Sequence, residues 1–262
     1  MRNSPIGIFD SGVGGLTIYE EIHRLLPDEN IIYLADSKNA PYGEKSKQEI
    51  INISVKNTEF LLSHGCKLIV VACNTASTNA VKYLREHYNI PFIRVQPAIK
   101  PAALNSKTKV VGILATKSTL KSELLYETSQ RFAQGVDVVE RVGVGLVTLI
   151  ESGKMHSEEM TSLLKKHILP MLEKDIDHLV LGCTHYPFLT DQIQEIVGNK
   201  VRILDSGEAI ARQTKVILEQ ENLINLDATE IKRRFYTNKD PEVMQKILDE
   251  FDEGFKAIKT NF

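Results

Sequence analysis

The sequence predicts an α/β protein built from two pseudo-symmetric, doubly wound parallel-sheet domains. Short runs of β-branched residues recur along the chain, and a helical pattern follows most of them. Such alternation is typical of parallel strands joined by crossover helices. The same scheme restarts after residues 96–101, a segment with two prolines that we interpret as the domain junction. Two short motifs at the ends of predicted strands also occur in both halves, which supports two similar domains.

The first half alternates strands and helices three times. Residues 68–72 (LIVVA) are apolar throughout, as expected of a parallel strand that is buried on both faces. Ser46 is followed by Glu49 at the spacing of a capping box, which predicts a helix start. The expected strands are 5–9, 31–35 and 68–72, and the expected helices are 14–26, 46–64 and 75–87.

The second half repeats the scheme, and a tail follows it. Its expected strands are 109–114, 136–140, 178–181 and 201–204, and its expected helices are 118–132, 157–172, 188–197 and 207–220. A strand at 233–236 and a helix at 241–251 are expected to pack back on the first half. The predicted domains are therefore 1–97 together with 208–262, and 98–207.

A weak internal repeat supports two related halves. Residues 7–11 (GIFDS) are echoed by 112–116 (GILAT), and 71–75 (VACNT) are echoed by 181–185 (LGCTH). A cysteine thus ends the corresponding strand in each half. We expect the two halves to face each other across a cleft that holds the active site.

The composition narrows the function classes. The chain has 262 residues, a net charge of −2 and 25% charged residues, which excludes a disordered protein and a broad basic surface for nucleic acid. No apolar run approaches the roughly 20 residues of a membrane span, and the N-terminus has no signal-peptide pattern. Three cysteines do not make a disulfide framework. We therefore expect a cytoplasmic protein that acts on a small molecule, with no nucleic-acid or membrane partner.

Cys73 and Cys183 are the strongest candidates for chemistry. Each closes a predicted strand and opens a predicted helix, at the edge of the sheet where α/β proteins bind ligands. The positive end of a helix stabilises a thiolate there. A free cysteine is more often an inert core residue, and we interpret Cys66, which precedes its strand, in that way. Two cysteines at matching positions favour function.

Polar residues follow both cysteines. Asn74, Thr75, Thr184 and His185 offer hydrogen-bond donors that suit the carboxylates of an amino acid, although His185 could instead have a structural role. Asp10 is either a helix N-cap or an acid–base partner.

Two loops lie on the same side of the predicted sheet. The glycines at 12–15 lack the spacing of a dinucleotide-binding loop, and they allow a carboxylate to approach a helix N-terminus. Pro41, Tyr42 and Gly43 follow the second strand, at the same edge.

Other thiol and metal chemistries fit poorly. No arginine stands at the phosphatase spacing after either cysteine, the histidines are scattered, and no cysteine-protease signature is present.

Six segments together resemble the cofactor-independent aspartate/glutamate racemases. They read GIFDSGVGGL (7–16), YLADSKNAPYGEKS (33–46), VVACNTAS (70–77), ESG (151–153), GCTHYP (182–187) and DSG (205–207), in the order of the family. The resemblance implies two α/β domains with the active site between them. It also implies interconversion of L- and D-glutamate, which supplies D-glutamate to bacterial peptidoglycan, without a cofactor or a metal.

The resemblance also assigns roles to residues. It implies that Cys73 and Cys183 are the two catalytic thiols, and that Asp10, Glu151 and His185 flank them. The substrate-binding residues expected are Asp10, Ser11, Pro41, Tyr42, Gly43, Cys73, Asn74, Thr75, Thr116, Cys183, Thr184 and His185. Aspartate-specific relatives usually carry Glu in place of His185, which favours glutamate. Relatives that decarboxylate malonates lack one of the cysteines. A homodimer is expected from the family. No extension precedes the first strand, which by analogy disfavours activation by a cell-wall precursor.

Two thiols suit racemisation because one can remove the α-proton while the other donates a proton to the opposite face. By resemblance, Cys73 deprotonates D-glutamate and Cys183 deprotonates L-glutamate. Three alternatives stay open: a racemase for aspartate or another acidic amino acid, a silent amino-acid-binding protein, and a pyridoxal-phosphate racemase. The last needs a Schiff-base lysine, and no lysine stands out.

Overall fold

The computed structural model describes residues 2–226, 230–251 and 253–262. The chain divides into two compact units. Unit 1 comprises Met1–Val95 and Gly207–Phe262, and unit 2 comprises Gln96–Ser206. The joins expected from the sequence follow residues 97 and 207.

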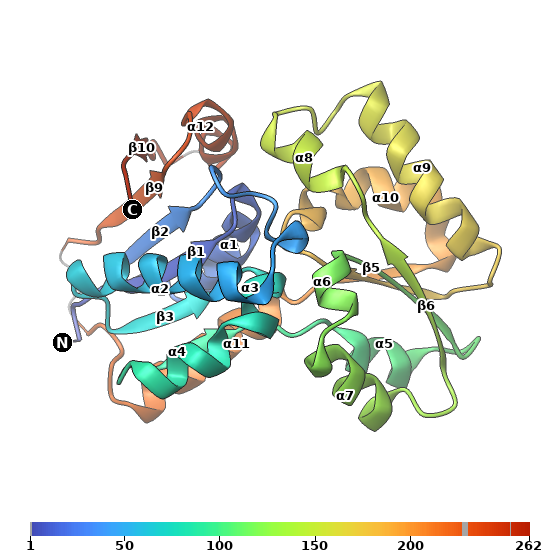
Figure 1. The fold of residues 1–262 in the computed structure, drawn as a ribbon, viewed down its shortest axis with the longest axis horizontal. Helices are drawn as coiled ribbons and strands as arrows, with labels where there is room; N and C mark the ends of the chain where they lie inside the picture. The colour runs from blue at the N-terminus through green and yellow to red at the C-terminus, as the bar shows by residue number, and fades with distance from the viewer. Residues whose placement is uncertain (1, 227–229, 252) are drawn as a thin grey trace. The chain divides into compact units, whose positions relative to one another are not determined.

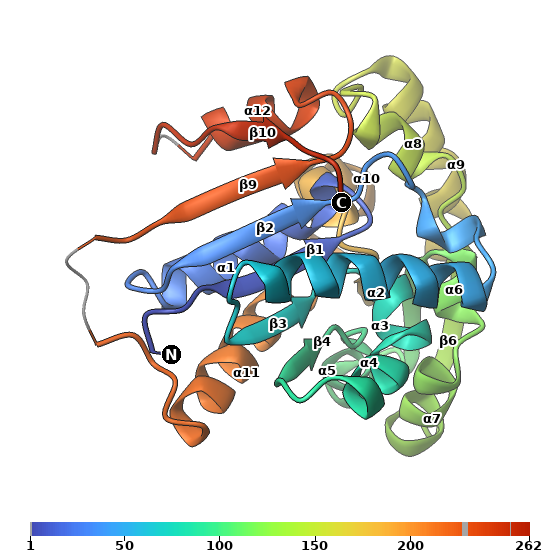
Figure 2. The same cartoon turned by 60° about the vertical axis from the view of Figure 1, so that its left-hand side comes forward.

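The described residues of unit 1 form a parallel sheet of six strands in the order β10-β9-β2-β1-β3-β4. Figure 2 shows β9 lying along β2, so the C-terminal segment extends the sheet that the N-terminal residues begin. The strands are β1 (Ile6–Asp10), β2 (Ile31–Ala35), β3 (Leu68–Val71), β4 (Phe92–Arg94), β9 (Arg233–Thr237) and β10 (Ala257–Lys259).

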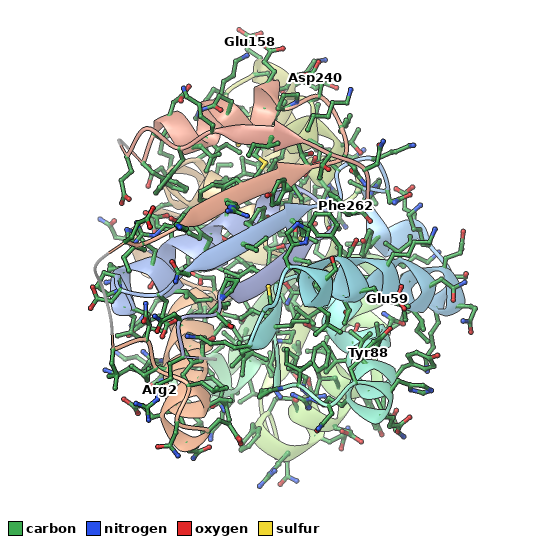
Figure 3. All side chains as sticks on the ribbon, turned by 90° about the vertical axis from the view of Figure 1, so that its left-hand side faces the viewer. Arg2, Glu59, Tyr88, Glu158, Asp240 and Phe262 are labelled. Atoms are coloured by element: carbon green, nitrogen blue, oxygen red, sulfur yellow. The ribbon has the colours of Figure 1, made fainter. Side chains whose placement is uncertain are left out.

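Helices cover both faces of this sheet. Helix α1 packs beside α11, whereas α2 packs beside α3 and α4, and α1 and α2 lie on opposite faces (Figures 1 and 2). On the α2 side, Tyr88 donates a hydrogen bond to Glu59 of α2 at 3.2 Å (Figure 3). The helices are η1 (Val13–Gly15), α1 (Leu16–Leu25), η2 (Tyr42–Glu44), α2 (Lys47–Ser63), α3 (Asn74–Asn79), α4 (Val81–His87), α11 (Gly207–Gln220) and α12 (Glu242–Asp249).

The described residues of unit 2 form a parallel sheet of four strands in the order β6-β5-β7-β8. Helix α5 packs with α7, and α9 packs with α8 and α10. The strands are β5 (Val110–Ala115), β6 (Asp137–Val142), β7 (His178–Gly182) and β8 (Arg202–Leu204). The helices are α5 (Ile99–Asn105), α6 (Lys117–Leu120), α7 (Glu123–Phe132), α8 (Leu146–Glu151), α9 (Glu158–Leu172), η3 (Tyr186–Leu189), α10 (Thr190–Val197) and η4 (Gly198–Lys200).

The two sheets repeat one topology. The order β2-β1-β3-β4 in unit 1 corresponds strand for strand to β6-β5-β7-β8 in unit 2. The register repeats as well, because Phe9 pairs with Val71 and Leu114 pairs with Leu181. Two residues beyond Val71 and Leu181 stand Cys73 and Cys183, at equivalent positions. The predicted pair of pseudo-symmetric, doubly wound parallel-sheet units is confirmed.

Several predicted elements differ from the structure in detail. The helix expected over 75–87 is two helices that meet at Ala80, and the helix expected over 118–132 is also two. In the latter, the Ser122 side chain accepts a hydrogen bond from the amide of Leu125 and so starts a second helix. The junction segment includes the start of α5, which tolerates Pro101 because first-turn amides need no intrahelical acceptor.

No helix among the described residues has the length and apolar character that crossing a membrane requires.

Candidate active site

Cys73 stands between β3 and α3 in unit 1. It occupies the N-cap position of α3 in an extended conformation, so its buried side chain lies at the carboxyl edge of the sheet. Its Sγ donates a hydrogen bond to Oγ of Ser11, which directly follows β1, at 3.6 Å. Neighbouring strand ends thus bring the two predicted residues together.

Asn74 carries a buried donor without a partner. The residue is only 4% exposed, and its Nδ2 atom makes no hydrogen bond. A buried donor left unpaired typically costs roughly 1–3 kcal/mol, so such groups are rare and often belong to ligand sites. Asn74 follows Cys73 directly, which makes its amide a natural donor to a bound carboxylate. Thr75, the next residue, is also buried.

Asp10 ends β1 and is buried. Its Oδ2 accepts a hydrogen bond from the amide of Gly12 at 3.1 Å. The N-cap alternative is wrong, because Gly12 and Gly15 are the N-caps of η1 and α1, and neither helix has a side-chain cap. A Cβ at Gly15 would lie 2.7 Å from Cβ of Asp10, so this position needs glycine.

The loop with Pro41, Tyr42 and Gly43 lies beside α3, against which η2 packs. The buried Tyr42 hydroxyl donates to the carboxylate of Asp36 and accepts from Nδ2 of Asn57 at 3.1 Å. Burial, the nearby Asp36 and the charge of Cys73 together raise the pKa of Tyr42 well above its ordinary value. The phenol is therefore held protonated next to the thiol.

Asp36 anchors this loop, and sequence reasoning did not single it out. Its carboxylate also accepts hydrogen bonds from the side chains of Asn39 and of Asn238, which follows β9. Burial raises the pKa of Asp36 despite these donors. Asp36 lies within segment 33–46, which resembles the racemase family, and this position was the sequence signal that could have pointed to it.

Cys183 follows β7 in unit 2 and is buried. The prediction that Cys183 opens an α-helix is wrong. The turn after Cys183 leads into the 3₁₀ helix η3, and α10 begins only at Thr190. A helix dipole is therefore a weaker influence here than expected. The Sγ of Cys183 lies instead 3.8 Å from Nδ1 of His185.

His185 and Glu151 form a buried pair. Nε2 of His185 donates to Oε1 of Glu151 at 2.7 Å, and both side chains are shielded from solvent. Because the carboxylate holds the proton on Nε2, Nδ1 is the lone-pair nitrogen that faces Cys183. An imidazole in that position can take up the thiol proton. The structure thus brings together three predicted residues, of which Glu151 is 34 positions away from His185 in the chain.

The remaining predicted residues lie at the same strand edges. Thr184 is buried beside Cys183. Thr116 follows β5 as Ser11 follows β1, and it caps α6 by accepting the amide of Thr119 at 3.2 Å. The predicted site residues in unit 1 are Asp10, Ser11, Pro41, Tyr42, Gly43, Cys73, Asn74 and Thr75, and those in unit 2 are Thr116, Glu151, Cys183, Thr184 and His185.

Known proteins that resemble this chain identify its family. The profile of the family described as Asp/Glu/Hydantoin racemase matches residues 6–214. The chain belongs to this racemase family.

Individual relatives span nearly the whole chain. A glutamate racemase from Herpetosiphon aurantiacus is 45% identical over 247 residues, which cover 94% of this chain and 97% of the relative. Among solved structures, glutamate racemase isoform RacE1 from Bacillus anthracis superimposes with a TM-score of 0.87 at 31% identity, covering 100% of this chain and 99% of that one. The Escherichia coli glutamate racemase, solved with L-glutamate and the activator UDP-MurNAc-ala, gives 0.84 at 36% identity, covering 97% of each chain.

In this racemase-family chain, the third cysteine differs from the other two. Cys66 is buried and precedes β3, and burial raises its pKa to about 12. A thiol of such high pKa stays protonated, as expected of a structural cysteine. Among the described residues, His, Cys, Asp and Glu form no group of three or more that could ligate a metal ion.

Proposed function

We propose that this chain is a glutamate racemase, which interconverts L- and D-glutamate without a cofactor through two thiols. The equivalence of Cys73 and Cys183, each placed at the end of the third strand of a repeated sheet, carries the proposal. Racemisation needs proton transfer on both faces of one carbon, so duplicated thiols suit it.

In the proposed reaction, one cysteine acts as a thiolate and removes the α-proton, which leaves a carbanion stabilised as an enolate-like carboxylate. The other cysteine, as a thiol, donates its proton to the opposite face. The first thiolate has then become a thiol and the second has become a thiolate. This form of the enzyme is ready to convert the opposite enantiomer, and proton exchange between the thiols and water restores the starting form. We propose that Cys73 deprotonates D-glutamate and that Cys183 deprotonates L-glutamate.

Polar neighbours prepare the two thiols for this exchange. In the proposal, His185 takes the proton of Cys183 while Glu151 stabilises the resulting imidazolium, which the 2.7 Å contact favours. In the same proposal, Asp10 and Ser11 tune the proton affinity of Cys73, whose Sγ donates a hydrogen bond to Ser11. The two thiols therefore have different partners, and their proton affinities can be tuned separately.

Substrate binding falls to the donors around both cysteines. The unpaired Nδ2 of Asn74 supports a carboxylate there. The proposed substrate-binding residues are Asp10, Ser11, Pro41, Tyr42, Gly43, Cys73, Asn74, Thr75, Thr116, Cys183, Thr184 and His185. His185 stands where aspartate-specific relatives usually carry Glu, which favours glutamate over aspartate.

The proposal also covers the cellular role of the enzyme and its assembly. D-Glutamate made by this chain would serve peptidoglycan synthesis in the cytoplasm, and the enzyme would act as a homodimer of chains with two domains, 1–97 plus 208–262 and 98–207.

Proton NMR and circular dichroism of the cofactor-free protein test the activity directly. In D2O, L-glutamate should lose its α-proton signal while its ellipticity decays to zero, and L-aspartate run in parallel should change far more slowly. Exchange with aspartate at the same rate would contradict the substrate assignment. No exchange with either amino acid, in folded and reduced protein, would overturn the racemase proposal.

A further inference from the structure

Two consecutive residues after Cys183 contact both ends of α8. His185 binds Glu151, the last residue of this helix, through its Nε2 at 2.7 Å. Tyr186 donates from its hydroxyl to the carbonyl of Gly143, which precedes the helix, at 3.3 Å. The turn that carries the thiol therefore holds α8 at its start and at its end.

The loop before α8 fits closely around the Tyr186 phenol. A Cβ at Gly143 would lie 2.3 Å from the Tyr186 hydroxyl oxygen, so the ring packs directly against the loop backbone. Burial raises the pKa of Tyr186 well above its ordinary value, and the charge of Cys183 raises it further. The hydroxyl therefore stays protonated and remains a donor.

A second side chain holds the next carbonyl of the same loop. Nε2 of His167, from α9, donates to the carbonyl of Val144 at 3.0 Å, and its Nδ1 accepts from Nε of Arg141 at 3.4 Å. His167 is buried, and two adjacent carbonyls of one loop are thus fixed from two different elements.

Helix α8 depends on this loop for its position. It has six residues, and it begins after Gly145, which is left-handed (φ 86°) and supplies no side-chain cap. A helix this short has little stability of its own, so its anchors decide where Glu151 lies. A shift of Glu151 would change the orientation of His185 and the distance from Nδ1 to Cys183.

We propose that Tyr186 and His167 are positioning residues for the Cys183 half of the reaction, acting through the 143–145 loop, Glu151 and His185. The inference rests on the proposed racemase function and deepens it. Neither side chain needs to touch the substrate. Their task is to keep the carboxylate–imidazole–thiol array in the geometry that proton transfer requires.

The effect should be confined to one of the two proton transfers. For enantiomers the equilibrium constant is one, so kcat/KM falls equally in both directions whichever step is slowed. The primary deuterium isotope effect, however, separates the steps. If transfer at Cys183 becomes slower, α-deuterated L-glutamate shows a larger effect, and α-deuterated D-glutamate, which loses its deuterium to Cys73, shows a smaller one.

The test compares Tyr186→Phe with the wild-type enzyme, and His167→Leu serves as a second variant that acts on the neighbouring carbonyl. We expect kcat to fall about tenfold, the scale that slight misplacement of catalytic groups produces, with KM changed less than about twofold. The isotope effect should rise from L-glutamate and fall from D-glutamate in both variants.

Tyr33→Phe is the matched control. It removes a buried phenol that donates to a glycine carbonyl, Gly12, at 2.7 Å in unit 1. This control should not reproduce the rise from L-glutamate. Unchanged isotope effects in Tyr186→Phe and His167→Leu, or the same asymmetry in Tyr33→Phe, would overturn the positioning role while leaving the racemase function intact. Wild-type protein without racemase activity would overturn the function itself.

Discussion

The Sγ of Cys183 lies 3.8 Å from Nδ1 of His185, two residues further along the chain. Cys73, at the equivalent position of unit 1, has the hydroxyl of Ser11 as its hydrogen-bond partner at 3.6 Å. A repeated scaffold thus carries thiols with unlike neighbours, one beside an imidazole and the other beside a hydroxyl. In the proposed reaction, this difference in neighbours lets one thiol act as the base while the other acts as the acid.

Cys73→Ser and Cys183→Ser should each abolish racemisation. A serine hydroxyl is far more basic as an anion than a thiolate, so kcat should fall by about 10³-fold or more. Cys73→Ala should still let Cys183 exchange the α-proton of L-glutamate, but not that of D-glutamate. Circular dichroism follows racemisation, and NMR in D2O follows exchange.

Cys66→Ala is the control for these substitutions. Cys66 is buried and its pKa is raised to about 12, so it should not take part in proton transfer. Activity close to that of the wild type is expected. A fully active Cys73→Ser or Cys183→Ser enzyme would sink the two-thiol scheme.

Asn74→Ala should weaken substrate binding without lowering stability. Its Nδ2 has no partner in the folded chain, so removal of the amide breaks no hydrogen bond of the protein. Loss of a hydrogen bond to a carboxylate is worth about 1.5–3 kcal/mol, so KM should rise about 10–150-fold. Steady-state kinetics and urea unfolding measure the two quantities. A large loss of stability at unchanged KM would show that Asn74 is structural.

Lys67→Met should destabilise unit 1 strongly. Lys67 and Glu29 form an ion pair of 2.6 Å in which both side chains are almost fully buried. Removal of one partner of such a pair typically costs about 3–5 kcal/mol, because the other charge is left buried and unpaired. The double variant with Glu29→Leu should lose less than the sum of the single variants. A double-mutant cycle by urea unfolding checks this, and additive losses would argue against coupling.

The pair lies at the amino ends of the strands, where the amide of Lys67 donates to the carbonyl of Pro5. Cys73 follows the opposite, carboxyl end of β3. Kinetic constants of the folded Lys67→Met variant should therefore stay close to those of the wild type.

Asp177→Asn should destabilise the protein at neutral pH but not at low pH. Burial alone would raise the pKa of Asp177, but hydrogen bonds from His178 and from the backbone amides of Lys107 and Thr108 lower it well below its ordinary value. A lowered pKa in the folded state stabilises the fold above the unfolded-state pKa of about 4, and this stabilisation is lost as the pH falls below that value. We expect a loss of about 1–2 kcal/mol at pH 7 that shrinks below pH 4, measured by urea unfolding. A loss independent of pH would contradict this linkage.

Local signals predicted the long elements of the fold. The Ser46–Glu49 capping box predicted the start of α2, where both reciprocal hydrogen bonds are present. Residues 68–72 predicted a buried strand, and β3 lies there. Helix α8 escaped prediction because six residues are too few for a periodic pattern, and its left-handed Gly145 gives no capping signal. Strands β4 and β10 escaped prediction as well, and they are shorter still, with three residues each.

The part of the site that the sequence predicted is the part marked by cysteine. Two cysteines at equivalent strand ends are visible in the sequence itself. The tethering roles of Tyr186 and His167 are not, because they depend on contacts with Gly143 and Val144 that are 43 and 23 residues distant. Only the folded chain brings these pairs together.

The split composition of unit 1 has a consequence for synthesis on the ribosome. Residues 96–206 emerge as a complete unit, whereas unit 1 waits for residues 207–262. Until these are made, β2 lacks its neighbour β9 and α1 lacks α11. A chain stalled before residue 207 therefore exposes an unpaired strand edge, which is prone to aggregation. The half that begins first is thus the half that finishes folding last.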